Sequence, residues 1–170
     1  GGKNRQVAIP HPNLQKAYLR KLYEQKEHFS DFQITIEATH HGPTDIDKPV
    51  LFVEIGTTEK QWTDVSLCES VAKIVQKVMQ MKLTPSPTAI CFGGTHYPEK
   101  FTNEILAGNY SLGTVVPRHA IDSLDEELFF HILKRNDGAS VALLDWNGLG
   151  PHKQKILDLL EKTNLEVVKI

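Results

Sequence analysis

Polar residues and glycines gather in three short segments of the sequence, and each segment follows a run with the pattern of a β-strand. These are residues 38–44 (ATHHGPT), 54–62 (EIGTTEKQW) and 93–97 (GGTHY). In open α/β sheets, ligands bind beyond the carboxyl ends of the parallel strands. We therefore expect the three segments to converge at one edge of a sheet.

The histidines of these segments are candidate metal ligands. With the carboxylate of Glu54, His40, His41 and His96 offer the nitrogen and oxygen atoms that zinc takes, and catalytic zinc sites combine three protein ligands with one open position. Neighbouring side chains on an extended chain point to opposite sides, so His40 and His41 can share a cleft only in an irregular loop. A surface or structural role is the alternative for each single histidine, and a shared site is the prediction for the group.

Glu54 interrupts an otherwise apolar run over residues 50–55, near its last position. A carboxylate in such a run must be paired, hydrogen-bonded or exposed at the edge of the sheet. Its placement suits a general base with a shifted pKa. The alternative is an ion pair with a nearby arginine or lysine.

Backbone amides in two of the segments are candidates for substrate binding. Gly93 and Gly94 allow N–H groups to approach an anion or an oxyanion closely. Thr57 and Thr58 precede a helical pattern, so they either cap that helix or hold a carbonyl or phosphate group with its first amides.

Two aromatic residues and one turn leave further alternatives open. Trp62 and Tyr97 either stack on a nucleic-acid base or pack into the core. Residues 145–149 (DWNGL) follow another strand pattern and either line the cleft or form a turn around Asn147.

Strand and helix patterns alternate along the chain, which predicts a three-layer α/β/α sandwich around a mostly parallel mixed sheet. Because residues 39–49 are long enough to cross the sheet, we predict a parallel crossover there rather than a hairpin. The expected strands are residues 32–38, 50–55, 88–92, 110–116, 139–145 and 165–170. The expected helices are residues 14–22 capped by Asn13, 67–81, 98–107, 124–134 with a capping box from Ser123 to Glu126, and 151–162.

Size and composition are typical of one compact domain, because the 170 residues are 40% hydrophobic with mixed charges. We assign residues 7–170 to it and interpret residues 1–6 as a tag remnant or linker. No apolar run is long enough to cross a bilayer, so we expect a cytoplasmic protein with no membrane partner. A net charge of -2 argues against a broad nucleic-acid-binding surface and leaves room for a small local one.

Several short stretches together resemble the archaeal and plant type of D-aminoacyl-tRNA deacylase, over roughly its C-terminal two thirds. They are PHPNLQKAYL, ATHHGPT, FVEIGTTEKQW, GGTHYPEKFT, residues 113–118 and DWNGL, in the family's order and approximate spacing. The resemblance implies a fold of the phosphorylase and peptidyl-tRNA hydrolase group, zinc as cofactor, and hydrolysis of the ester between a D-amino acid and the tRNA 3′ end. The residues that match family motifs are His40, His41, Glu54, Thr57, Thr58, Trp62, His96 and Tyr97.

Three positions depart from the motifs of this family. Thr114 stands where the family has a histidine, and Arg118 and Asn147 stand where it has lysines. Threonine cannot replace an imidazole as a base or metal ligand.

Two hypotheses follow. In the first, the chain is an active hydrolase in which Glu54, His41 and His96 are catalytic, His40, His41 and His96 hold zinc, and Thr57, Thr58, Trp62, Gly93, Gly94, Tyr97 and Arg118 bind the substrate. In the second, it is a non-catalytic deacylase-like module, part of a larger chain, that binds tRNA or a protein partner.

Overall fold

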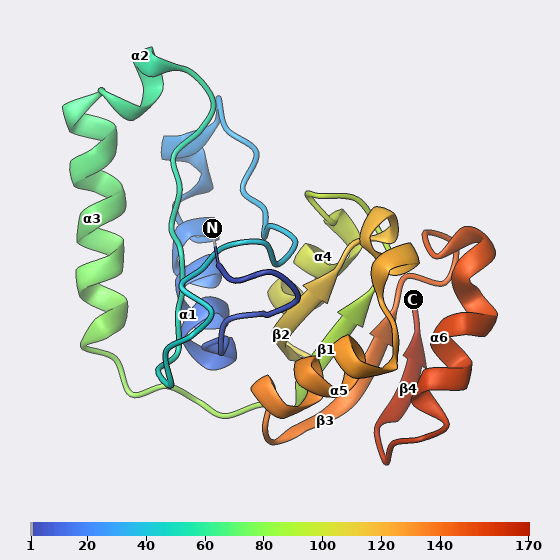
Figure 1. Ribbon diagram of the computed structural model, residues 1–170. Coiled ribbons are helices and arrows are strands. Elements are labelled where there is room, and N and C mark those ends of the chain that lie inside the picture. Colours follow the sequence, from blue (N-terminus) through green and yellow to red (C-terminus); the bar gives the residue numbers. More distant parts are fainter. Residues whose placement is uncertain (1) are drawn as a thin grey trace.

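The computed structural model describes residues 2–170 as a four-stranded parallel sheet with helices on both faces (Figure 1). The strands follow the spatial order β2-β1-β3-β4, and each neighbouring pair is parallel. Their bounds are Thr88–Phe92 (β1), Ser111–Val116 (β2), Ala139–Leu144 (β3) and Glu166–Lys169 (β4). The predicted α/β sandwich is therefore confirmed.

Helices α1 and α4 pack on one face of the sheet, and α5 and α6 pack on the other. Helix α3 packs against α1 on the side away from the sheet, so it stands outside the sandwich (Figure 1). The helices are Pro12–Tyr23 (α1), Glu59–Trp62 (α2), Val65–Met79 (α3), Glu99–Ala107 (α4), Glu126–Arg135 (α5) and Lys153–Leu160 (α6). Short 3-10 helices cover Lys26–Phe29 (η1), Arg118–Ser123 (η2) and Gly150–His152 (η3).

Strand β1 shows why the sheet is stable. Its side chains alternate between the faces, so Ile90 and Phe92 join the cluster around Phe129 of α5, while Cys91 joins the cluster around Phe101 of α4. All five are fully buried. A strand covered on both faces is a continuous apolar run, which is why the sequence predicted this part of the fold so closely.

Two predicted strands, residues 32–38 and 50–55, are wrong. Both segments are extended, but neither joins the sheet. In the first, the Ile36 N–H donates to the Thr102 hydroxyl at 3.2 Å instead of to a neighbouring strand. In the second, Phe52 is 51% exposed, so the run is not covered on both faces. The predicted crossover at residues 39–49 therefore links two extended segments outside the sheet.

Some helix ends also differ from the prediction. Helix α1 begins at Pro12 after His11, one residue before the predicted cap Asn13, because proline fits the first helical position. Helix α5 begins after Asp125, whose carboxylate accepts the Leu128 N–H at 3.0 Å. The predicted cap Ser123 ends η2 instead. The last helix is divided between η3 and α6.

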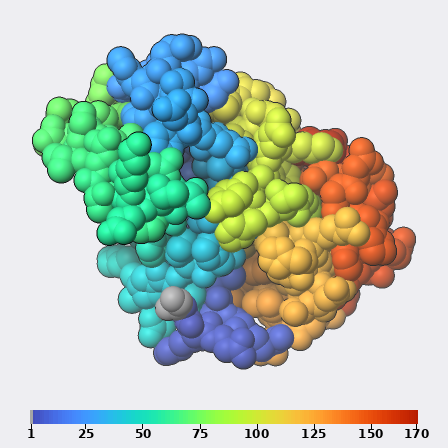
Figure 2. Space-filling model, turned by 90° about the horizontal axis from the view of Figure 1, so that it is seen from above, coloured from blue at the N-terminus to red at the C-terminus, as the bar shows by residue number. Residues whose placement is uncertain are grey.

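All four strands end at the same edge of the sheet, and Figure 2 looks down on this edge. Helices α4 and α5, which follow β1 and β2, lie on opposite faces. In open α/β sheets, ligands bind at the strand ends where successive connecting helices pass to opposite faces of the sheet. The space-filling view shows a hollow there, between the residues coloured blue to green and those coloured yellow-green.

The first residues lie against this domain. Gly1, part of the predicted tag remnant, lies outside the described residues. The Lys3 N–H donates to the Thr44 hydroxyl at 2.8 Å, and the Arg5 guanidinium pairs with Asp125 at 2.5 Å. Within residues 2–170, no helix is long and apolar enough to cross a membrane.

Candidate active site

Glu37 lies at the centre of a cluster of three histidines. Its Oε1 lies 2.8 Å from Nε2 of His96, and its Oε2 lies 3.0 Å from Nε2 of His40 and 3.3 Å from Nε2 of His41. The imidazole centroids of His40 and His96 are 4.8 Å apart. The predicted convergence of the histidines is therefore present, and a carboxylate joins them.

Backbone hydrogen bonds hold the segment that carries Glu37 against the ends of β1 and β2. The Ala38 N–H donates to the carbonyl oxygen of His96 at 2.8 Å. The next residue, Thr39, donates its N–H to the carbonyl oxygen of Val115 and accepts the Val115 N–H on its hydroxyl, both at 2.9 Å. These contacts place Glu37 and His40 beside the loop after β1.

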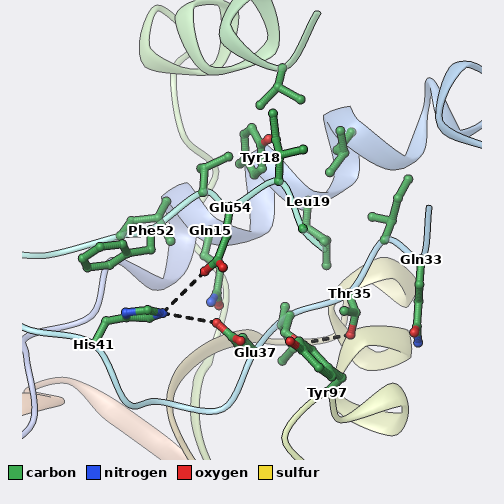
Figure 3. Close-up of a pocket in the computed structure, with 18 of the residues that line it drawn as sticks. Gln15, Tyr18, Leu19, Gln33, Thr35, Glu37, His41, Phe52, Glu54 and Tyr97 are labelled. Carbon is green, nitrogen blue, oxygen red and sulfur yellow. Dashed lines mark hydrogen bonds and ion pairs between the residues drawn. The ribbon is translucent and has the colours of Figure 1, made fainter. Parts of the chain in front are cut away.

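His41 connects Glu37 to a second carboxylate. Its Nε2 lies 3.8 Å from Oε2 of Glu54, and dashed lines in Figure 3 mark both of its carboxylate contacts. The Phe52 ring stacks on the imidazole with centroids 4.3 Å apart and planes 20° apart. Stacking and ion pairing together restrict the orientation of His41.

The charge of Glu37 dominates the local electrostatics. Partial burial pushes its pKa upward, but hydrogen bonds from His40, His96 and His41 outweigh burial, so the pKa of Glu37 lies below its ordinary value. The negative charge of Glu37 raises the pKa of Tyr97, which stays a neutral phenol. The cluster thus combines a stable carboxylate with imidazoles and a hydroxyl group.

A cavity of about 520 Å³ opens beside the cluster. Its walls come from α1, from the two extended segments and from Tyr97, so apolar side chains lie opposite the charged ones (Figure 3). This volume is within the range of small-molecule sites. The lining includes Tyr18, Leu19, Glu37, His40, His41, Phe52, Glu54, Thr57 and Tyr97.

Comparison with known proteins identifies the family. The family model described as D-aminoacyl-tRNA deacylase matches residues 1–168. The chain belongs to this family. A D-aminoacyl-tRNA deacylase of Cenarchaeum symbiosum is 55% identical over 99% of the chain, and one of Methanosarcina mazei is 34% identical over 99%. The crystal structure of a conserved protein of unknown function is 30% identical and matches 99% of the chain with a TM-score of 0.91.

These relatives are longer than the chain. The chain spans 65% of the length of the Cenarchaeum symbiosum deacylase, 56% of the Methanosarcina mazei deacylase and 60% of the crystallised protein.

The deacylase-like motif of residues 54–62 meets the cavity at only some of its positions. Glu54 and Thr57 line the cavity, and the Glu54 side chain is 64% exposed. The N–H groups of Thr57 and Thr58 both donate to Oε1 of Gln61, at 2.6 and 2.9 Å, which is a capping arrangement for α2. Trp62 is 52% exposed and is not part of the lining.

The Gly93 and Gly94 backbone, expected near an oxyanion, lies outside the cavity lining. The Gly93 N–H donates to the carbonyl oxygen of Val116 at 2.9 Å and is not free to bind a substrate. Both glycines have positive φ angles, 104° and 76°, which residues without a Cβ adopt easily, so glycine is needed here for the turn after β1. Arg118 is exposed at the start of η2, also outside the lining.

The positions that depart from the deacylase motifs lie away from the cluster. Thr114 is buried, and its hydroxyl accepts a hydrogen bond from the Asn136 amide at 2.7 Å. Asn147 is exposed in the turn after β3. Neither residue lines the cavity, so these two departures from the family motifs do not take an imidazole or a cation out of the cavity lining.

Sequence reasoning missed Glu37. Its alternation with Ile36 and Ala38 is typical of the outer face of a strand, which predicted a solvent-facing side chain. Its position three and four residues before His40 and His41 was the available signal. A carboxylate near two candidate ligands commonly supports or completes a metal site.

The donor atoms of the cluster fit a zinc ion. Two groups of side chains each bring their donor atoms within 4.8 Å of one another, and Glu37 belongs to both. The first adds His40 and His96, and the second adds His41 and Glu54. Imidazole nitrogen and carboxylate oxygen are ordinary zinc ligands, and either group leaves a coordination position open.

Proposed function

We propose that the chain is an ester hydrolase that releases a D-amino acid from the 3′ end of tRNA. The observation that carries the proposal is the cluster of Glu37 with His40, His41 and His96, in which Glu37, His40 and His41 line the cavity and His96 contacts Glu37 from outside the lining. Membership of the D-aminoacyl-tRNA deacylase family supports the substrate class. Because this substrate is made inside cells, the proposal implies a cytoplasmic location.

Zinc is the proposed cofactor, held by Glu37, His40 and His96. When bound, it would polarise a water molecule or the ester carbonyl. In the second group, His41 contacts Oε2 of Glu37, and Glu54 is the exposed member. Glu37 therefore holds the ion, and the carboxylate of Glu54 is available for proton transfer.

Glu54 is the proposed general base. Its carboxylate is exposed to water at the cavity mouth, and His41 lies between it and Glu37. Glu54 takes a proton from water as the water oxygen attacks the ester carbonyl. The bond between the carbonyl carbon and the ribose oxygen then breaks, and the ribose oxygen takes the proton back. The products are a free D-amino acid and a tRNA with a free hydroxyl group.

The remaining residues bind and orient the substrate. Thr57 and Tyr97 line the cavity beside the cluster, and the phenol of Tyr97 is neutral and can donate a hydrogen bond. The apolar wall from α1, with Tyr18 and Leu19, suits the side chain of the amino acid. Because Thr114 and Asn147 lie outside the cavity, their departures from the family motifs do not favour a non-catalytic module.

The test is deacylation of matched substrates. The purified chain, supplied with zinc, is expected to release a labelled amino acid from D-aminoacyl-tRNA well above the spontaneous rate, and Glu54→Gln is expected to lose most of this activity. Glu166→Gln, an equal charge change at an exposed site on β4, is the control. A folded, zinc-loaded protein that leaves D-aminoacyl-tRNA intact would overturn the proposal.

A further inference from the structure

A pair of lysines lies over one tryptophan at the edge where the strands end. The Lys169 ammonium is 3.8 Å from the centroid of the Trp146 ring, and the Lys153 ammonium is 4.8 Å from it. Trp146 follows β3, Lys169 ends β4 and Lys153 begins α6. The half-buried ring fixes both charges in position through cation–π contacts.

A third cation connects this pair to the candidate active site. The Arg118 N–H donates to the carbonyl oxygen of Gly94 at 3.0 Å, two residues before His96. The Arg118 guanidinium lies so close to Gly150 that a Cβ there would be 2.9 Å from Cζ. Gly150 is three residues before Lys153. The basic track, defined as Arg118, Lys153 and Lys169, therefore lies along the edge of the sheet, and the backbone of Arg118 is bonded to the loop that carries His96.

None of the three cations has a carboxylate partner among residues 2–170. Lys100 shows the usual alternative at the same edge, because it pairs with Asp145 at 2.8 Å. Two ammonium groups over one ring repel each other, and among residues 2–170 neither ammonium forms an ion pair that offsets that cost. Pre-positioned, unpaired cations are suited to an anionic ligand with more than one charge.

We propose that the basic track binds the sugar–phosphate backbone of a single-stranded RNA end, and so leads the ester of an aminoacyl-tRNA to the Glu37 cluster. This inference rests on the proposed function. Backbone contacts of this kind need no base recognition, and a local track can supply them on a chain whose net charge is -2. Lys169 ends β4 and Trp146 follows β3, so both belong to the edge of the sheet that Figure 2 views, where the hollow also opens.

RNA binding can be measured without any hydrolysis. In Trp62→Phe, Trp146 is the remaining tryptophan, so its fluorescence reports on the track. A short single-stranded RNA ending in CCA, with no amino acid attached, is expected to change this fluorescence saturably. The double variant Lys153→Gln/Lys169→Gln in the same background should bind at least tenfold more weakly, measured by anisotropy of labelled RNA. The slope of log K against log salt should fall by about 0.7 for each cation removed.

Lys134→Gln provides the matched control, because Lys134 is exposed in the last turn of α5, at the opposite edge of the sheet. It should bind RNA as the parent does. Unchanged affinity and salt slope in the double variant, or no RNA binding by the parent, would contradict the proposal that the basic track binds RNA. The proposed function is judged separately by deacylation. If both hold, the double variant should raise KM for D-aminoacyl-tRNA and leave hydrolysis of a small D-amino-acid ester unchanged.

Discussion

The sheet region, residues 88–170, contributes most of the buried core, whereas the extended region, residues 30–64, contributes most of the candidate active site. The sheet region is made of strands and helices that bury an apolar cluster on each face of the sheet. The extended region contains no strand and only the short helix α2, yet it supplies Glu37, His40, His41 and Glu54. The sheet region supplies one imidazole, that of His96.

This difference shows how an irregular segment can hold a defined site. Residues 36–39 bond to Thr102, His96 and Val115 of the sheet region, so the rigid part fixes the irregular part at a few points. Reactive side chains commonly lie on loops that a stable scaffold positions. Stability and chemistry should therefore respond to substitutions in different regions.

The largest expected effect on stability is in the sheet region. Phe129 is fully buried with its ring centroid 6.0 Å from that of Phe92, so Phe129→Ala should lower the free energy of unfolding by about 3–5 kcal/mol. Phe52→Ala, in the extended region, should cost less than about 1 kcal/mol because the ring is half exposed. Urea denaturation measures both. Equal losses would mean that the extended region is part of the core.

Activity should show the opposite pattern. Glu37→Gln keeps the shape of the side chain but removes the charge that three imidazoles contact and that the proposed zinc site needs, so kcat/KM for D-aminoacyl-tRNA should fall by at least about 10–100-fold. The melting temperature should change little. Deacylation kinetics and thermal unfolding of the same sample separate the two effects. If Glu37→Gln had the same kcat/KM as the parent, Glu37 would not be part of the active site.

A finer contrast lies within the cluster. His96 is the histidine that contacts Oε1 of Glu37, whereas His40 and His41 share Oε2. His40 and His96 are proposed zinc ligands and His41 is not, so His40→Ala and His96→Ala should each lower zinc affinity by at least about 10–100-fold, whereas His41→Ala should lower it less. Titration with a competing chelator measures all three. An equal loss in His41→Ala would place His41 among the zinc ligands.

The same contrast explains which features of the fold the sequence could predict. Strands β1, β2 and most of β3 were predictable because burial on both faces requires continuous apolar runs, whereas β4 is mostly exposed. Residues 32–38 have the alternating burial of a strand, but the pattern does not reveal that Ile36 bonds to the Thr102 hydroxyl. The apolar run at residues 50–55 lines a cavity, and hydrophobicity alone does not distinguish a cavity wall from a core.

The site was predictable in part for a related reason. The convergence of His40, His41, His96 and Glu54 followed from their positions after expected strands, although two of those strands do not form. Glu37 was missed because a polar residue between two buried ones indicates an outer face. His40 lies three residues after Glu37, but His96 comes from a distant part of the chain, and only the tertiary structure shows that both contact Glu37.

The smallest expected effect concerns the contact of the first residues with the sheet region. The Leu128 N–H and the Arg5 guanidinium hold the pKa of Asp125 below its ordinary value of 3.8. Because the folded pKa is the lower one, this contribution to stability is present above the unfolded pKa and is lost as the pH falls through the folded pKa. Asp125→Asn keeps an oxygen that can cap α5 but loses the ion pair with Arg5. The variant should be slightly less stable than the parent at pH 7, and the gap should be smaller in acid below pH 3.8, as measured by urea denaturation at neutral and acid pH. A gap that persists in acid would mean that Asn caps α5 poorly and that the charge contributes nothing.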